Sequence, residues 1–244
     1  MKGSTLMITN LSDITIFSEL PEEALLRIAP LLKERQFKKN HVLMFENDLS
    51  EEVYLIRSGM LKVYRLSEDR EIVLSIATAG DILGESEALS SDNHRISSVE
   101  ALENVSVWQI GKQDFLYIVE QYPAVLRKAY TILIERMRIL NRLIRYLSLY
   151  DVRTKTANLI MDLYFNFGKH NDNVYKIDLK IRQSLMANML GVTRESISKT
   201  LSDFQAEGIL DIQDKYLFIL DKSKLESICN KIEEIPELRK WNSQ

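Results

Sequence analysis

The spacing of hydrophobic positions changes twice along the chain. In residues 20–34, LPEEALLRIAPLLKE, apolar side chains recur at helical spacing after Pro21, which predicts a short N-terminal helix. Residues 41–110 instead contain short runs rich in β-branched and aromatic residues, which predict strands. These runs read VLMF, VYLI, LKVYRL, EIVLSIA and VSVWQI, and the segments END, RSG, SEDR and TAGD between them are typical of turns. We therefore expect a small antiparallel barrel or sandwich.

A helical pattern begins at Pro123 and repeats with the period of a coiled coil. Seven apolar residues, termed the seam, alternate steps of four and three: Leu126, Tyr130, Leu133, Met137, Leu140, Ile144 and Leu147. The seam predicts that two copies of the chain pair as a homodimer. The alternative is a helix packed on its own barrel, because Ile132, Ile134 and Ile139 add apolar surface off the seam. The two interpretations are compatible, since they use different faces of one helix.

The last third of the chain predicts a winged helix-turn-helix. Asp151 can cap the N-terminus of a helix over VRTKTANLIMDLYF, and the polar segment GKHNDN, residues 168–173, predicts a loop. Gly191 then separates two helical segments with the spacing of helices that cross at a tight turn. Gly208 can end the second helix, and ILDIQDKYLFIL predicts two short strands after it. We expect a final helix over roughly residues 222–234.

Composition places the chain among globular proteins of a reducing compartment. Its 244 residues are 45% apolar and 27% charged, which suffices for one large or two ordinary domains. A single cysteine, Cys229, excludes an internal disulfide framework, a cysteine zinc site and a four-cysteine iron–sulfur cluster. The longest apolar stretch, residues 130–150, contains Glu135 and four arginines, and the N-terminus has no signal-peptide core. We expect a cytoplasmic protein that does not associate with a membrane.

The formal net charge of −3 means that any DNA binding must depend on a local cationic surface. The segment GVTRESISKTL offers one, because a helix capped by Thr193 would expose polar side chains on its N-terminal half. These side chains are Arg194, Glu195, Ser198 and Lys199. Arginine or lysine can donate to guanine, and glutamate can accept from cytosine. The alternative is a solvated helix face on which Glu195 pairs with Lys199.

The order of the predicted elements and the segment DILGESEALSSDNHRISSVEAL together resemble the CRP/FNR family of bacterial transcription regulators over nearly the whole chain. The segment resembles the phosphate-binding cassette of that family. The resemblance implies an α+β fold in three parts. These are a jelly-roll effector domain (a double-stranded β-helix) over residues 1–122, a dimerisation helix over residues 123–150 and a winged helix-turn-helix domain over residues 151–244.

The cassette suits a small anionic effector on physical grounds. Gly84 lets the backbone approach an anion, Glu85 can accept from ligand hydroxyls, and Arg95 presents a fork of donors to an oxyanion. The resemblance adds Arg136 on the dimer helix as a second cation near the effector. The alternative is a structural cassette in which Glu85 and Arg95 pair with each other.

Three departures from the family pattern weigh against cyclic AMP as the effector. Ile96 stands where cyclic-AMP binders have a hydroxyl residue after the cassette arginine, although Ser97 follows it. Leu140 and Asn141 occupy the helix positions that resemble an adenine-contacting Thr-Ser pair. No cofactor is assigned and no metal site is expected, because the single cysteine excludes the iron–sulfur cluster of FNR-type members. Haem is the open alternative, which only His41, His94 or His170 could ligate through imidazole, and nothing else in the sequence supports it.

In the helix-turn-helix, Arg194 and Glu195 resemble the arginine–glutamate pair of the cyclic-AMP receptor. Glu195 and Ser198 resemble the FNR pattern, with Lys199 where arginine is usual. Gln183 and Ser184, at the start of the first helix of the motif, are expected to position DNA phosphates.

We predict a homodimeric, sequence-specific transcription regulator that binds an inverted-repeat DNA site under the control of an effector. The resemblance also implies RNA polymerase as a partner. One alternative is a regulator that needs no effector. Another is the regulatory subunit of a cyclic-nucleotide-dependent enzyme, although no nucleophile–base set, metal-ligand cluster or nucleotide loop follows residue 123. We therefore expect no catalytic activity.

Overall fold

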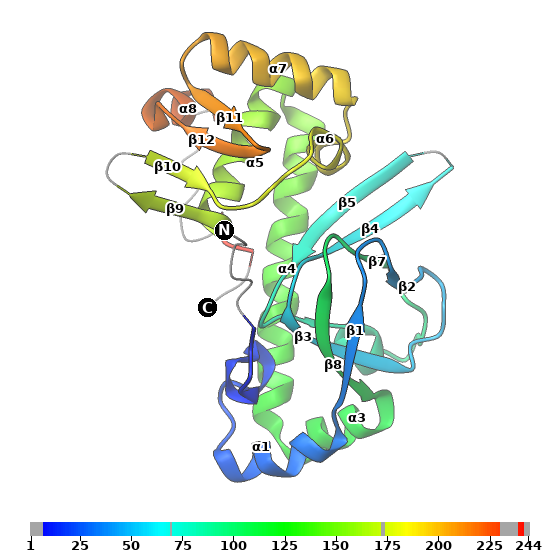
Figure 1. Cartoon of the computed structure of the whole chain (residues 1–244). Helices are drawn as coiled ribbons and strands as arrows, with labels where there is room; N and C mark the ends of the chain where they lie inside the picture. Colours follow the sequence, from blue (N-terminus) through cyan, green and yellow to red (C-terminus); the bar gives the residue numbers. More distant parts are fainter. Residues whose placement is uncertain (1–6, 69, 172–173, 230–238, 242–244) are drawn as a thin grey trace. The chain divides into compact units, whose positions relative to one another are not determined.

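A computed structural model describes residues 7–68, 70–171, 174–229 and 239–241 of the chain (Figure 1). The chain divides into two compact units. The first comprises the residues up to Arg65 together with Leu74–Arg136, and the second comprises Leu66–Val73 together with the residues from Met137 on. Within the described residues, no helix is both long and apolar enough to cross a membrane.

Two four-stranded antiparallel sheets form the centre of the first unit. One sheet has the order β1-β8-β3-β6, built from Lys33–Phe37, Val105–Gly111, Glu52–Ser58 and Ile82–Leu83. The other has the order β2-β7-β4-β5, built from Val42–Met44, Ser98–Ala101, Leu61–Ser67 and Arg70–Ala77. The fold is the expected jelly-roll, and the non-sequential strand order shows that chain crossovers connect the sheets.

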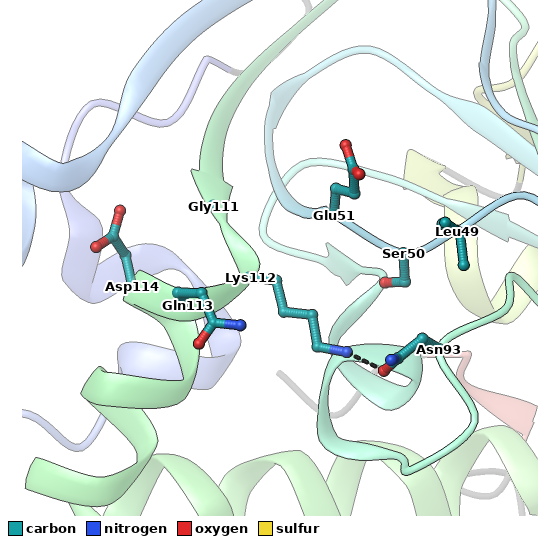
Figure 2. Close-up of a pocket in the computed structure, with 8 residues that line it drawn as sticks. All are labelled: Leu49, Ser50, Glu51, Asn93, Gly111, Lys112, Gln113 and Asp114. Carbon is teal, nitrogen blue, oxygen red and sulfur yellow. Dashed lines mark hydrogen bonds between the residues drawn. The ribbon is translucent and has the colours of Figure 1, made fainter.

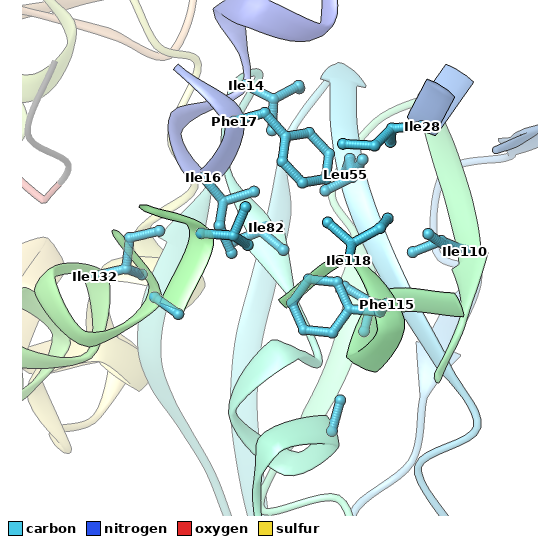
Figure 3. Close-up of a cluster of buried hydrophobic side chains, with 14 of the residues drawn as sticks. Ile14, Ile16, Phe17, Ile28, Leu55, Ile82, Ile110, Phe115, Ile118 and Ile132 are labelled. Carbon is cyan, nitrogen blue, oxygen red and sulfur yellow. The ribbon is translucent and has the colours of Figure 1, made fainter. Parts of the chain in front are cut away.

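Strand β3 reads as a continuous apolar run because both faces of its sheet are covered. Tyr54 and Ile56 point into a core that residues of both sheets share. Val53 and Leu55 point the other way, into a core completed by helices and by the N-terminal segment. Figure 3 shows this second core, in which Phe17 and Phe115 converge with isoleucines from several elements. The alternation of side chains along a strand supplies both cores from four consecutive residues.

The predicted N-terminal helix is shorter than expected. Helix α1 spans Glu22–Ile28 and continues as the 3-10 turn Ala29–Leu31, so the helix predicted over residues 20–34 is wrong at its C-terminal end. Pro30 explains the change, because proline lacks the N–H group that would continue the α-helical hydrogen bonds, although Ala29 before it keeps α conformation. Strand β1 follows directly, and two further 3-10 turns, Leu11–Asp13 and Thr15–Phe17, precede α1.

The predicted turns contain residues with positive φ. Asn47 in END, Gly59 in RSG, Glu68 in SEDR and Gly80 in TAGD have φ values of 71°, 89°, 51° and 96°. These values lie in the left-handed region that turns require and that glycine and asparagine adopt most readily. The predicted turns are therefore present, whereas strands β1, β6 and β7 lie outside the predicted runs.

Three helices complete the first unit and lead out of it. They are α2 (Glu85–Leu89), α3 (Lys112–Gln121) and α4 (Pro123–Leu149). Val125, Ala129 and Ile132 of α4 are buried in the core that contains Phe17. One face of α4 thus packs on the β-domain, as the sequence indicated for Ile132, and the seam occupies a different face.

The second unit is a winged helix-turn-helix. Its helices are α5 (Val152–Phe167), α6 (Gln183–Leu190), α7 (Arg194–Ala206) and α8 (Lys222–Ile228). An antiparallel sheet of order β11-β12-β10-β9 is built from Leu210–Gln213, Tyr216–Ile219, Val174–Ile177 and Gly168–Asn171. The loop predicted from GKHNDN is therefore wrong over its first four residues, which form β9, because backbone pairing with β10 overrides their polar composition.

The predicted N-terminal caps of two helices in this unit are confirmed. Asp151 accepts a hydrogen bond from the Thr154 N–H at 2.7 Å and caps α5, and Thr193 accepts from the Ser196 N–H at 3.2 Å and caps α7. Gly208, with φ of 69°, follows the end of α7. The final predicted helix is observed as α8, and residues 230–234 of the prediction lie outside the described residues.

Candidate effector site and DNA-binding surface

Gly84 and Arg95 are in direct contact in the cassette. Gly84 has φ of 86°, and a Cβ atom at this position would clash with the Arg95 guanidinium and come within 2.9 Å of the Glu52 carbonyl oxygen. The glycine therefore permits both the backbone conformation and the approach of the arginine. The loop that holds Arg95 is fixed by two backbone hydrogen bonds, from the Asn47 N–H to the Arg95 carbonyl and from the Arg95 N–H to the Asp48 carbonyl.

Glu85 is the first residue of α2 and is tied to the long helix α4. Its Oε1 accepts from Arg136 Nη1 at 2.5 Å, and Arg136 Nη2 donates to the Ile82 carbonyl oxygen at the same distance. The carboxylate is only 2% exposed, and this burial raises its pKa, while the charge of Arg136 acts in the opposite direction. The predicted residues Gly84, Glu85, Arg95 and Arg136 thus lie close together within the first unit.

The two charged side chains of the cassette do not pair with each other. Arg95 donates through Nη2 to the Glu52 carbonyl oxygen at 2.6 Å, and Glu85 pairs with Arg136. The alternative of a Glu85–Arg95 ion pair is therefore wrong. Each side chain retains one buried atom without a hydrogen-bond partner in the described structure, Oε2 of Glu85 and Nη1 of Arg95. A buried acceptor and a buried donor of this kind fit a small ligand with hydroxyl and oxyanion groups.

The three residues that depart from the cyclic-AMP pattern, Ile96, Leu140 and Asn141, are all exposed. Ile96 is exposed, and its N–H donates to Glu87 Oε1 at 3.4 Å, whereas the following Ser97 is buried. Leu140 and Asn141 are exposed on α4. The residue directly after Arg95, Ile96, thus has no hydroxyl group, and its apolar side chain faces solvent.

Two partners in the cassette were missed by sequence reasoning. The carbonyl oxygens of Glu52 and Ile82 accept from Arg95 and Arg136, respectively. A backbone carbonyl has no side-chain signal, so only the folded chain reveals its role.

A separate open pocket lies beside the cassette loop (Figure 2). It is lined by Leu49, Ser50, Glu51, Asn93, Gly111, Lys112, Gln113 and Asp114. Lys112 Nζ contacts Asn93 Oδ1 across it, and two carboxylates, Glu51 and Asp114, belong to the same lining. Because charges of both signs line this pocket, no single class of ligand is indicated.

The seam of α4 is exposed in the single chain. Six of its residues, all except Leu147, have exposed fractions between 38% and 66%. The exceptional position, Leu147, is half-buried, and its Cδ2 lies 3.1 Å from where a Cβ on Gly191 would be. A continuous apolar face of this kind on a surface helix is typical of an interface with another chain.

Helix α7 presents the predicted DNA-reading residues at its N-terminal half. Arg194, Glu195 and Lys199 are exposed and Ser198 is half-buried, while Ile197 and Leu201 on the opposite face are buried. In the described part of the chain, neither cation of this group forms an ion pair, so the alternative Glu195–Lys199 pair is not observed. Gln183 is half-buried and Ser184 is exposed at the start of α6.

The wing places further cations that the sequence analysis did not select. Asp214 and Lys215, with φ of 50° and 70°, form the two-residue turn between β11 and β12. The Ile181 N–H donates to the Lys215 carbonyl at 3.2 Å, which ties this turn to the segment before α6. Lys180 Nζ lies 5.2 Å from the ring centroid of Tyr216. Lys180 and Lys215 thus form a cationic group near the helix-turn-helix.

Comparisons with known proteins agree with this architecture. Residues 34–122 match the cyclic nucleotide-binding domain family, and residues 141–228 match the Crp-like helix-turn-helix domain family. The chain is similar to the CRP-like cAMP-activated global transcriptional regulator of Mycobacterium tuberculosis, with 24% identity over 86% of this chain and 94% of that protein. It is also similar to the fumarate and nitrate reduction regulatory protein of Vibrio cholerae, with 25% identity over 92% of this chain and 90% of that protein.

A solved structure supports the same assignment. A CooA mutant from Carboxydothermus hydrogenoformans matches with a TM-score of 0.75 and 26% identity, over 92% of this chain and 98% of that chain. The fold and the site together define a DNA-binding transcription regulator with an effector domain of the cyclic-nucleotide-binding type. The chain belongs to the CRP/FNR family of transcription regulators.

Proposed function

We propose that this regulator works as a homodimer whose affinity for an inverted-repeat DNA site is set by a small anionic effector in the cassette. The main observation in support of an effector is that two buried atoms, Glu85 Oε2 and Arg95 Nη1, have no hydrogen-bond partner in the described structure. A buried donor and acceptor each cost free energy unless a ligand satisfies them. An oxyanion beside Arg95 and a hydroxyl beside Glu85 would satisfy both.

Arg136 couples effector binding in the cassette to the dimer helix α4. Its guanidinium already occupies Oε1 of Glu85, so a ligand that engages Glu85 changes the partners available to α4. A ligand can shift a conformational equilibrium only by binding one state more tightly than the other. The contact between Glu85 and Arg136 is where that difference in binding arises.

The DNA-binding residues have separate roles in this proposal. Arg194, Glu195, Ser198 and Lys199 read base edges in the major groove, and Thr193 fixes the start of their helix. Gln183 and Ser184, together with the wing residues Lys180 and Lys215, contact phosphates. We further propose that the protein acts in the cytoplasm with RNA polymerase as a partner, as its family membership supports.

A panel of small anions, including cyclic nucleotides, tests the effector proposal. We expect one of them to change the affinity of the full chain for its preferred DNA site, and we expect Arg95→Ala to abolish that response. Arg65→Ala is the matched control, because Arg65 is exposed and pairs with Glu46 on the domain surface. Native mass spectrometry of freshly purified protein would reveal a retained ligand as added mass.

A regulator that needs no effector is the second candidate. The pairing of Arg136 with both Glu85 and the Ile82 carbonyl favours it, because a fixed cassette can brace α4 without a ligand. Equal DNA affinity with every anion of the panel, and no retained mass, would decide for this candidate.

A further inference from the structure

Helix α5 contains a row of buried polar side chains that DNA binding does not explain. Asn158, Asp162 and Asn166 follow one another at intervals of four residues and therefore share one face of the helix. Asn158 and Asp162 are almost fully buried, and Asn166 is half-buried. Burying amide and carboxylate groups costs free energy unless each is hydrogen-bonded. The row therefore needs a polar partner.

The C-terminal segment provides that partner. Arg239 Nη1 donates to Asp162 Oδ1 at 2.7 Å, and its Nη2 donates to Asn158 Oδ1 at 3.0 Å. Asn166 holds the backbone on either side of Lys240, since its Nδ2 donates to the Arg239 carbonyl at 3.0 Å and its Oδ1 accepts from the Trp241 N–H at 2.7 Å. A side-chain amide that pairs with a backbone N–H and a backbone carbonyl binds a chain segment irrespective of the segment's side chains.

Trp241 adds an apolar anchor next to these polar contacts. Its side chain is buried, and its ring meets that of Phe167 in an edge-to-face arrangement, with centroids 5.6 Å apart. Lys240, between the two anchored residues, is exposed. The segment is thus held by Arg239 and Trp241, with Lys240 facing solvent.

The same carboxylate also binds the end of α4. Tyr146 OH donates to Asp162 Oδ2 at 3.0 Å, and Arg142 Nη1 lies 3.4 Å from Asp162 Oδ1. A further bond crosses the junction between the helices, from Lys155 Nζ to the Leu147 carbonyl at 3.2 Å. Asp162 is therefore the meeting point of the C-terminal half of α4, α5 and the C-terminal segment, and these contacts lie inside the second unit.

We propose that residues 239–241 act as a latch that fixes the end of the dimer helix to α5 and so holds the junction at residues 150–151. Arg239 neutralises a buried carboxylate to which α4 is also bound, so the latch stabilises the α4–α5 contact itself. With the latch closed, the end of α4 and the helix-turn-helix move as one body. This inference rests on the proposed homodimer, because a fixed junction matters most when two recognition helices must hold one spacing.

Hydrogen exchange of the full chain tests the latch without DNA. The variants are Arg239→Ala and Trp241→Ala, with Lys240→Ala as the matched control from the same segment. We expect the Thr154 and Lys155 amides, which are bonded to Asp151 at the junction, to exchange about 3- to 30-fold faster in both latch variants and unchanged in the control. Should Arg239→Ala fail to fold, Trp241→Ala provides the same test with the charges retained.

DNA binding provides the second measurement. We expect the latch variants to lose about 3- to 30-fold in affinity for the full inverted repeat and to keep wild-type affinity for one isolated half-site. Unchanged exchange at the junction would overturn the latch. Equal losses on both DNAs would also overturn it, because they would show that the segment only supports the folding of the DNA-binding domain. If wild-type protein shows no preference for an inverted repeat, the proposed dimer fails, while the exchange result still decides the latch.

Discussion

The guanidinium of Arg136 lies 2.5 Å from the carboxylate of Glu85, and this contact, together with the hydrogen bond from Arg136 to the Ile82 carbonyl, joins the long helix α4 to the cassette. Glu85 is buried and Arg136 is about two-thirds buried, so the pair is asymmetric in its exposure to water. Breaking the contact costs the carboxylate more free energy than the guanidinium, because the buried carboxylate has little access to water.

Removing Arg136 should destabilise the protein in a pH-dependent way. Burial raises the pKa of Glu85 above its ordinary value of 4.5, so the folded state retains this proton to a higher pH than the unfolded state does. Stability therefore falls as pH rises above 4.5, and Arg136 reduces the fall. We expect Arg136→Ala to cost about 1–3 kcal/mol of unfolding free energy at pH 7 and less near pH 4.5. Chemical denaturation at both pH values measures the difference.

The double variant Glu85→Gln/Arg136→Ala is the control for this mechanism. It leaves no charge to be buried, so it should recover much of the lost stability and show a weaker pH dependence. Arg138→Ala, an exposed arginine on the same helix, should have little effect at either pH. A loss in Arg136→Ala that is the same at pH 4.5 and pH 7 would exclude the Glu85 carboxylate as its cause.

Replacing Gly84 should damage the cassette more than replacing a glycine with ordinary backbone geometry. Gly84→Ala would introduce a Cβ atom against Arg95 and the Glu52 carbonyl at positive φ. We therefore expect the substitution to lower the free energy of unfolding by about 1–3 kcal/mol. Gly111→Ala is the control, because Gly111 has φ of −64° and its added Cβ would meet Asp114 at an ordinary 3.6 Å. Thermal unfolding of both variants provides the test, and equal losses would show that the crowding at Gly84 is relieved at little cost.

The exposed seam should determine the oligomeric state. We expect Leu133→Asp/Leu140→Asp to be monomeric in sedimentation velocity and to bind an inverted repeat poorly, because two charges would enter an apolar interface. Thr131→Asp/Arg138→Asp adds the same two acidic groups to exposed positions off the seam and should remain dimeric. A dimeric seam variant would place the interface elsewhere.

The sequence predicts those parts of the fold whose side chains signal their own environment. The run VYLI predicts β3 because alternate residues enter two cores, and Thr193 and Asp151 predict helix starts because their oxygens bond nearby N–H groups. Strand β1, KERQF, has no apolar signal, since it is mostly exposed and pairs with β8 through its backbone. Its existence depends on a partner about 70 residues away in the chain, so no local pattern predicts it.

The candidate site was predictable to a similar extent. Charged side chains such as Arg95 and Arg136 are recognisable from their chemistry and from the resemblance, but their carbonyl partners on Glu52 and Ile82 are not. The contact between Arg239 and Asp162 joins residues 77 positions apart. Sequence patterns predict which groups can pair, and only the fold determines which of them meet.

Arg194 should read bases, whereas the cations of the wing should bind DNA of any sequence. A base contact contributes to binding only on the correct DNA site. Arg194→Ala should therefore lose about 1–3 kcal/mol of binding free energy on the preferred inverted repeat and much less on unrelated DNA. Lys215→Ala is the matched control, because its positive charge lies on the turn of the wing. The Lys215→Ala variant should bind both DNAs more weakly by about the same factor. The slope of its affinity against salt concentration should decrease by about the amount that one phosphate contact contributes.

Titrations of both variants on both DNAs at several salt concentrations distinguish these roles. The preferred site comes from selection on random DNA, which should yield half-sites about one helical turn, roughly 34–36 Å, apart. If Arg194→Ala weakens all sequences alike, Arg194 contributes charge without reading bases. Specificity would then come from Glu195, Ser198 or Lys199, since these side chains share the accessible N-terminal half of α7 with Arg194.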